Sequence, residues 1–277
     1  MNEKIIQFGP NKSLVGILTE PNVNTKKLPG FIFVNSGLLH RIGPFRIYVS
    51  LSRKLAESGY HSFRIDLSGK GDSLTRKNSL SLAENIKLDI KDAMDYLESQ
   101  EGINQFIVCG ICTGADNAYE SGFDDDRITG IIPVDGYAYP TLKFKLRRYA
   151  PKLLNKTSWV NLIKRAFRLD QYKKEELNQQ NLKANYRMIF PPLHQFKLNI
   201  KKALDSGKQF LIIYTGGWRE FYNYEEQLTD CLPEIKHHKN LQLAYNSDSD
   251  HTFILHKDQR WLIEKITTWA NERFLNK

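Results

Sequence analysis

The sequence predicts an α/β fold built on a mostly parallel sheet of eight strands with helices on both faces. Short apolar runs recur along the chain, and amphipathic helical patterns separate most of them. Strands that alternate with helices in this way form parallel sheets covered by helices on both sides. With 277 residues, 41% of them hydrophobic, the chain is long enough for one such domain with an insertion.

The expected strands follow from the apolar runs. They span residues 4–8, 14–19, 31–34, 61–66, 105–109, 130–134, 209–214 and 241–245. The first two runs leave no room for a helix between them, so we expect them to pair as an antiparallel hairpin.

Three amphipathic helices are expected from apolar residues at helical spacing. They follow the third run, precede the fifth run and close the chain. Their apolar faces comprise Tyr48, Leu51 and Leu55; then Ile86, Ile90, Ala93, Met94 and Leu97; and finally Leu262, Ile266, Trp269 and Ala270.

The segment 137–207 breaks the alternation of strands and helices and is far longer than the ~2–6 residues of an ordinary connection. We therefore expect a core of residues 1–136 and 208–277 with an insertion at 137–207. An apolar stripe at helical spacing indicates a helix inside the insertion, formed by Trp159, Leu162, Ile163, Ala166 and Phe167. The insertion fits either a lid over the carboxyl edge of the sheet or a helical subdomain that only stabilises the fold.

The charge of the chain is uneven. Its formal net charge is +9, and the stretch 143–168 contains no acid. Such a stretch fits a solvated helix face, an acidic protein partner, an anionic substrate or a membrane surface. Nucleic acid is not expected, because no recognised binding motif accompanies the charge. The basic residues are Lys143, Lys145, Arg147, Arg148, Lys152, Lys156, Lys164, Arg165 and Arg168.

The chain shows no apolar stretch of signal-peptide length at its start and no run near the ~20 residues of a membrane span. Its three cysteines, Cys109, Cys112 and Cys231, do not make a disulfide framework. We therefore expect a cytoplasmic protein with free thiols. The sequence does not indicate an oligomeric state.

The residues 110–114, Gly-Ile-Cys-Thr-Gly, follow the fifth expected strand and lead into small residues. Glycines two positions before and after Cys112 suit a sharp strand-to-helix elbow, in the pattern G-x-S-x-G with cysteine in place of serine. A glycine-containing loop around a buried cysteine fits the same residues. Cys109 and Cys112 also match a redox dithiol. A closed metal site is not expected, because only Cys231 remains and no histidine pair lies nearby.

The chain resembles the α/β-hydrolase superfamily over nearly its whole length. The matching stretches are residues 35–44 (NSGLLHRIGP), 66–73 (DLSGKGDS), 110–114 (GICTG), 135–139 (DGYAY) and 250–253 (DHTF). Within the superfamily it resembles the cysteine-elbow hydrolases associated with bacterial exopolysaccharide and exosortase gene clusters. The resemblance implies an α/β-hydrolase fold with an inserted helical lid.

The resemblance implies a nucleophile at Cys112 and a base at His251, because the chain order in this fold is nucleophile, acid, histidine. Either Asp135 or Glu220 is then the acid, and we favour Asp135 because its stretch matches the family. Asp66 and Asp72 are expected to order the loop after the fourth strand.

The oxyanion of the intermediate requires hydrogen-bond donors. In this fold they are the backbone N–H of the residue after the nucleophile, here Thr113, and one from the loop after the third strand, for which we choose Leu38. Gly37 and His40, in the same loop, are expected to line the substrate site. Loop packing explains His40 equally well.

These residues predict acyl transfer through an acyl-cysteine, on an ester or a thioester, without metal or organic cofactor. An acidic acyl-carrier protein or the phosphates of coenzyme A would suit the basic stretch. Two other classes stay open. One is a non-catalytic binding or scaffold protein that retains the fold, and the other is a thiol redox protein that uses Cys109 and Cys112.

Overall fold

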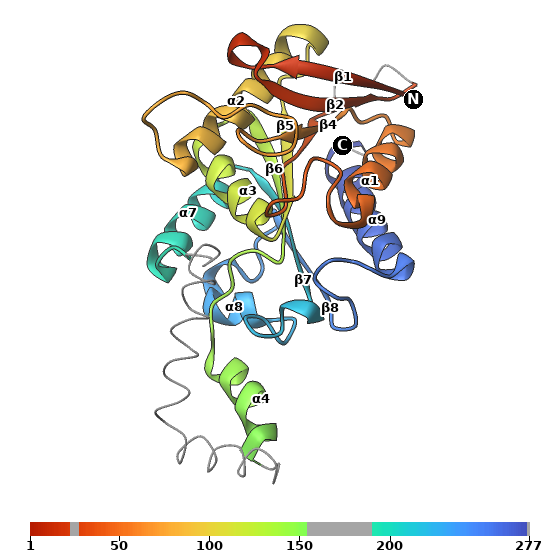
Figure 1. The fold of residues 1–277 in the computed structure, drawn as a ribbon. Coiled ribbons are helices and arrows are strands. Elements are labelled where there is room, and N and C mark those ends of the chain that lie inside the picture. The colour runs from red at the N-terminus through yellow and green to blue at the C-terminus, as the bar shows by residue number, and fades with distance from the viewer. Residues whose placement is uncertain (23–27, 154–189, 276–277) are drawn as a thin grey trace, which may run out of the picture.

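A computed structural model describes residues 1–22, 28–153 and 190–275 of the chain. Its centre is one eight-stranded sheet in the order β1-β2-β4-β3-β5-β6-β7-β8 (Figure 1). The strands are β1 (Asn2–Phe8), β2 (Leu14–Glu20), β3 (Gly30–Phe33), β4 (Ser62–Asp66), β5 (Phe106–Ile111), β6 (Ile128–Val134), β7 (Gln209–Thr215) and β8 (Leu241–Asn246).

The sheet is mostly parallel, as the sequence predicts. β1 pairs antiparallel with β2, and β2 pairs antiparallel with β4. From β4 through β3 to β8 every neighbouring pair is parallel. The predicted hairpin of the first two strands is confirmed. Because β3 and β5 to β8 run in the same direction, the loops at their carboxyl ends meet at one edge of the sheet.

Helices cover both faces of the sheet (Figure 1). On one face lie α1 (Ile47–Glu57) and α9 (His256–Ala270), and their apolar sides share a core with β3, β5 and β7. On the other face lie α2 (Leu82–Glu101), α3 (Thr113–Asp124) and α7 (Leu193–Asp205). The residues predicted to form the apolar faces of three helices are all buried in α1, α2 and α9.

Helix α2 illustrates how the sequence sets an element boundary. Its N-cap is Ser81, whose hydroxyl accepts a hydrogen bond from the N–H of Glu84 while the Glu84 side chain accepts one from the N–H of Ser81. This capping box satisfies donors that a helix start leaves unpaired. At the other end Gly102 has a φ of 68°, the left-handed conformation that glycine adopts readily.

The predicted insertion is described only at its ends. α4 (Leu142–Leu153) follows β6, and α7 precedes β7. The stripe from Trp159 to Phe167 lies outside the described residues, so the lid and the domain boundaries remain predictions. A short helix, α8 (Gln227–Cys231), follows β7. Within the described part of the chain, no helix combines the length and the apolar character that a membrane crossing needs.

Candidate active site

Cys112 lies at the tip of a sharp turn between β5 and α3. Its φ is 59° and its ψ is −124°, a strained conformation for a residue with a side chain. A Cβ on Gly110 would lie 2.1 Å from the carbonyl oxygen of Gly114, and one on Gly114 would lie 2.8 Å from that of Asn35. Both glycines are therefore required by close backbone contacts. The predicted elbow is the observed local structure.

The neighbouring strand β6 and helix α1 hold the elbow in place. The N–H of Cys112 donates to the Val134 carbonyl oxygen over 2.9 Å. The N–H of Ile111 donates to the Tyr48 hydroxyl over 3.0 Å. Because Cys112 caps the start of α3, its side chain lies where free N–H groups and the helix dipole favour negative charge. The thiol is half-buried.

Asp135 directly follows β6 and is fully buried, with a φ of 53°. Its carboxylate accepts hydrogen bonds from the Thr215 N–H at 2.7 Å and from the Thr215 hydroxyl at 2.6 Å. Its Oδ2 also lies 2.8 Å from Nδ1 of His251, in the loop after β8. Two groups of Thr215 thus fix the carboxylate that meets the imidazole.

The partly exposed imidazole of His251 contacts an acidic, a thiol and an aromatic side chain. Burial alone would lower its pKa, but hydrogen bonds with Asp135 and Cys112, together with their negative charges, raise it to about 10. The Trp218 ring stacks on the imidazole, with 4.6 Å between the ring centroids and 15° between the planes. The side chain of His251 therefore lies between the Asp135 carboxylate and the Cys112 thiol and contacts both.

Glu220, the other predicted acid, does not contact these three side chains. Its side chain is exposed, and its backbone carbonyl accepts a hydrogen bond from the Arg148 guanidinium. Within the described residues, the carboxylate that contacts His251 belongs to Asp135. A 3-10 turn separates Glu220 from the end of β7, whereas Asp135 directly follows β6.

The loop after β3 lies against the elbow. The N–H of Gly37 donates to Thr113 Oγ1 over 2.8 Å. As the first residue of α3, Thr113 has a backbone N–H without an intrahelical partner. Leu38 is 73% exposed, and its N–H makes no hydrogen bond with the described residues. His40 is exposed on the same loop.

Asp66 orders the loops beside the site, as the sequence predicts. Its carboxylate accepts hydrogen bonds from the Asn35 amide at 3.0 Å, from the Arg41 N–H at 2.7 Å and from the Asp72 N–H at 3.1 Å. The Arg41 guanidinium forms ion pairs with both Asp66 and Asp72. These contacts join the loop after β3 to the loop after β4.

Cys109, three residues before Cys112, differs from it in its surroundings. Cys109 is 1% exposed and lies in the core beneath α1 and α9. Burial raises the pKa of its thiol far above the ordinary value. Among the described residues, no group of three or more His, Cys, Asp or Glu side chains is placed to hold a metal ion.

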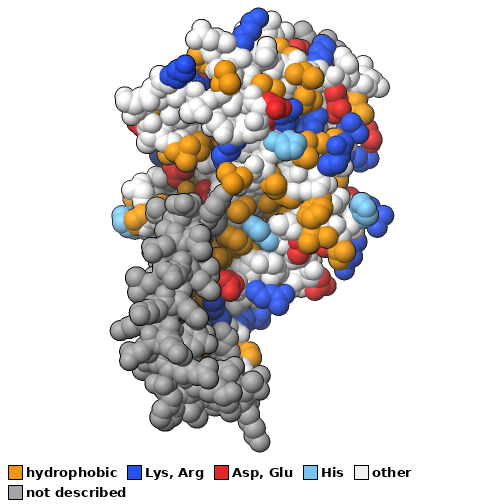
Figure 2. Space-filling model, in the orientation of Figure 1, with side chains coloured by type: hydrophobic (Ala, Val, Ile, Leu, Met, Phe, Trp, Pro, Cys, Tyr) orange, Lys and Arg blue, Asp and Glu red, His pale blue; other side chains and the backbone are white. Residues whose placement is uncertain are grey.

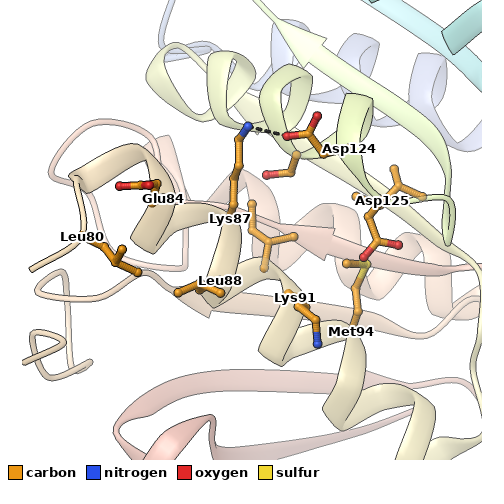
Figure 3. A pocket seen from close by; sticks show the side chains of 11 residues that line it. Leu80, Glu84, Lys87, Leu88, Lys91, Met94, Asp124 and Asp125 are labelled. Atoms are coloured by element: carbon orange, nitrogen blue, oxygen red, sulfur yellow. Dashed lines mark hydrogen bonds and ion pairs between the residues drawn. The ribbon is translucent and has the colours of Figure 1, made fainter. Parts of the chain in front are cut away.

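Hydrophobic side chains gather near the middle of the face shown in Figure 2. Among the described residues, exposed hydrophobic side chains in the loops at the carboxyl edge of the sheet include Leu38, Phe221 and Ile254. A separate pocket of about 510 Å³ lies between α2 and α3. Figure 3 shows Lys87 reaching Asp124 across it. The α3 residues that line this pocket lie near the end of the helix, well over 10 Å along its axis from Cys112. We therefore place the candidate active site at the elbow and not in this pocket.

No family model and no curated protein matches the chain. Several solved structures, in contrast, match the chain over nearly its whole length. An esterase of Pyrococcus furiosus is 13% identical with a TM-score of 0.62, covering 99% of this chain and 92% of that one. An alpha-beta serine hydrolase homologue from Coxiella burnetii is 16% identical with a TM-score of 0.57, and 96% of each chain is covered. Est1E from Butyrivibrio proteoclasticus is 14% identical with a TM-score of 0.57 over 100% of both chains.

At these identities the likeness shows the fold, and the chain has the α/β-hydrolase fold. The likeness to cysteine-elbow hydrolases of exopolysaccharide clusters rests on the motifs and remains a prediction.

Two further residues of the site are not predicted from the sequence: Thr215, which binds the Asp135 carboxylate, and Trp218, which stacks on the His251 imidazole. Thr215 is the last residue of β7 and Trp218 ends the turn that follows, and this place at the same edge as the elbow is the signal that the sequence offers for them.

Proposed function

We propose that this chain is an acyl-transfer enzyme that hydrolyses or transfers the acyl group of an ester or a thioester through an acyl-cysteine on Cys112. The observation that carries the proposal is the continuous contact from Asp135 through His251 to Cys112 at a strained elbow. A nucleophile, a base and a group that orients the base, in hydrogen-bond contact, are the requirements of nucleophilic catalysis.

The raised pKa of His251, about 10, supports a charged resting state. At neutral pH the imidazole then holds its proton, and a protonated imidazole beside Cys112 favours attack by a thiolate. Thiolates are nucleophilic without removal of a proton in the transition state. Asp135 supports this state because its carboxylate stabilises the imidazolium through Nδ1.

The reaction proceeds in two displacements. The Cys112 thiolate attacks the carbonyl carbon, and the oxyanion accepts hydrogen bonds from the N–H groups of Leu38 and Thr113. The bond to the leaving alcohol or thiol then breaks, and His251 donates its proton to that group. Water or another nucleophile next attacks the acyl-cysteine, while His251 removes its proton. This releases the acyl product and restores the thiolate.

A thioester suits this site, because exchange between two thiol esters is close to neutral in energy. The basic residues at the start of the insertion add a preference for an anionic carrier of the acyl group, either an acidic carrier protein or coenzyme A. On α4, the Arg147 guanidinium carbon lies 5.4 Å from the centroid of the Tyr224 ring. The Arg148 guanidinium donates a hydrogen bond to the Glu220 carbonyl oxygen in the loop after β7. Lys164 and Arg165 lie outside the described residues.

A redox role for Cys109 and Cys112 has less support. Thiol exchange needs thiolates, and burial of Cys109 strongly opposes its ionisation. A scaffold protein that retains the fold would keep the elbow without a reactive thiol.

The test is release of free thiol or acid from acyl-coenzyme A, acyl-carrier protein and p-nitrophenyl esters of matched chain length. We expect turnover by the wild type, loss in Cys112→Ala, and retention in Cys231→Ala, which removes the other half-buried thiol. Equal background rates for the wild type and Cys112→Ala with every donor would contradict the proposal. Arg147→Ala and Arg148→Ala should slow the carrier-bound donors more than the p-nitrophenyl esters.

A further inference from the structure

A lysine reaches the loop that carries the proposed oxyanion donor. Lys70 lies between Gly69 and Gly71 in the turn after β4, and its Nζ donates to the Gly37 carbonyl oxygen over 2.8 Å. The side chain is half-buried, and burial lowers its pKa below the ordinary value. Among the described residues, no carboxylate lies within ion-pair distance of Lys70. Its hydrogen bond within the described residues is therefore to a backbone carbonyl.

Two contacts fix the backbone on both sides of Gly37. Its N–H donates to Thr113 Oγ1, and its C=O accepts from Lys70. In a trans peptide the C=O of one residue and the N–H of the next lie in one plane and point in opposite directions. The bond from Lys70 to Gly37 therefore turns the N–H of Leu38 away from Lys70. That N–H has no partner among the described residues.

We propose that Lys70 is a positioning residue for the oxyanion hole, holding the peptide between Gly37 and Leu38 so that the Leu38 N–H faces the carbonyl attacked by Cys112. The inference rests on the proposed function. Hydrogen bonds in series strengthen one another, so a cation on the carbonyl also makes the N–H of the same peptide a better donor. Lys70 acts through the peptide and is not assigned a contact with the substrate.

The position of the turn supports this role. A Cβ on Gly71 would lie 2.2 Å from the Asp66 carboxylate, so the turn packs directly on the group that also binds Arg41 and Asn35. Lys70 thus projects from a turn that is already fixed to the loop after β3. This arrangement restricts the ammonium to the region of Gly37.

The test separates oxyanion formation from thiolate reactivity. Lys70→Met keeps the aliphatic length without the donor, and Lys70→Arg keeps a cationic donor. Lys77→Met is the matched control, because Lys77 is exposed in the same connection between β4 and α2. For each protein we would measure the rate of Cys112 acylation by an acyl thioester, which forms an oxyanion, and of alkylation by iodoacetamide, which does not. Thermal unfolding reports on folding.

Removing one oxyanion donor typically costs about 10²–10³-fold in rate. Because Lys70→Met displaces a donor without removing it, we expect acylation to slow by about 10–100-fold, with alkylation within about twofold of wild type. Lys70→Arg should recover most of the loss, and Lys77→Met should match wild type.

An unchanged acylation rate in Lys70→Met would overturn the inference, as would an equal loss of acylation and alkylation, which would indicate general damage to the elbow. Absence of acylation in the wild type itself would instead refute the proposed function, and the inference would fail with it.

Discussion

Oδ2 of Asp135 lies 2.8 Å from Nδ1 of His251, although the two residues are 116 positions apart in the chain. Because Nδ1 meets the carboxylate, Nε2 is the nitrogen left for the Cys112 thiol. Thr215 fixes the other side of the carboxylate through its N–H and its hydroxyl. One buried carboxylate thus sets both the orientation and the charge of the imidazole.

Asp135→Asn should slow acyl transfer by about 10²-fold. A serine triad loses about 10⁴-fold without its acid, and we expect less here because a thiolate–imidazolium pair is already charged. Glu220→Gln is the matched comparison and should stay within about threefold of wild type. Turnover of one acyl thioester by both variants checks this. A larger loss in Glu220→Gln than in Asp135→Asn would reverse the assignment of the acid.

His251 should make the stability of the fold depend on pH. Its pKa is about 10 in the folded chain, against an ordinary value of 6.5. A raised folded-state pKa stabilises the fold fully below pH 6.5, and the contribution is lost as the pH rises towards 10. Because one pKa unit corresponds to about 1.4 kcal/mol, we expect a loss of up to a few kcal/mol.

Urea unfolding of the wild type and of His251→Gln, at several values between pH 6 and pH 10, measures this contribution. The gap between the two free energies of unfolding should be widest at low pH and shrink as the pH rises. A gap that stays constant over this range would show that the imidazole is not held as a cation.

Gly217→Ala should displace the histidine loop. A Cβ on Gly217 would lie 2.1 Å from the His251 backbone nitrogen, which must then move. We expect at least about a tenfold loss of acyl transfer, together with ~1–3 kcal/mol of stability. Gly102→Ala is the control. This substitution adds a side chain at a φ of +68° with open space around it. It should therefore lower the stability of the fold and leave the activity unchanged. Equal activity losses in both variants would indicate general destabilisation.

The three thiols should differ in reactivity. At neutral pH iodoacetamide should label Cys112 first. Cys231 should react slowly, because burial raises its pKa to about 11. Cys109 is buried and should react only after unfolding. Peptide mapping over a labelling time course measures the order. A disulfide between Cys109 and Cys112 under mild oxidant, or early labelling of Cys109, would favour the redox interpretation.

Local patterns in the sequence predict most of the fold. Each of the eight expected strands overlaps an observed strand, because buried parallel strands are short apolar runs bounded by polar residues. The elbow was predictable because backbone crowding at Gly110 and Gly114 excludes other residues. Chain order placed His251 in the loop after β8.

Contacts between distant loops were beyond local patterns. Lys70 stands inside a recognised motif, yet its bond to Gly37 depends on how two loops 33 residues apart fold together. Thr215 and Trp218 likewise act on Asp135 and His251 only through the packing of the sheet edge. The choice between Asp135 and Glu220 needed the same tertiary information.

Formation of an acyl-cysteine on Cys112 is tested most directly by the mass of the protein after brief incubation with short-chain and long-chain acyl thioesters, followed by peptide mapping. We predict one acyl adduct, located on Cys112, in the wild type and in Cys231→Ala, and none in Cys112→Ala. No adduct with any donor, together with slow alkylation of Cys112, would contradict it.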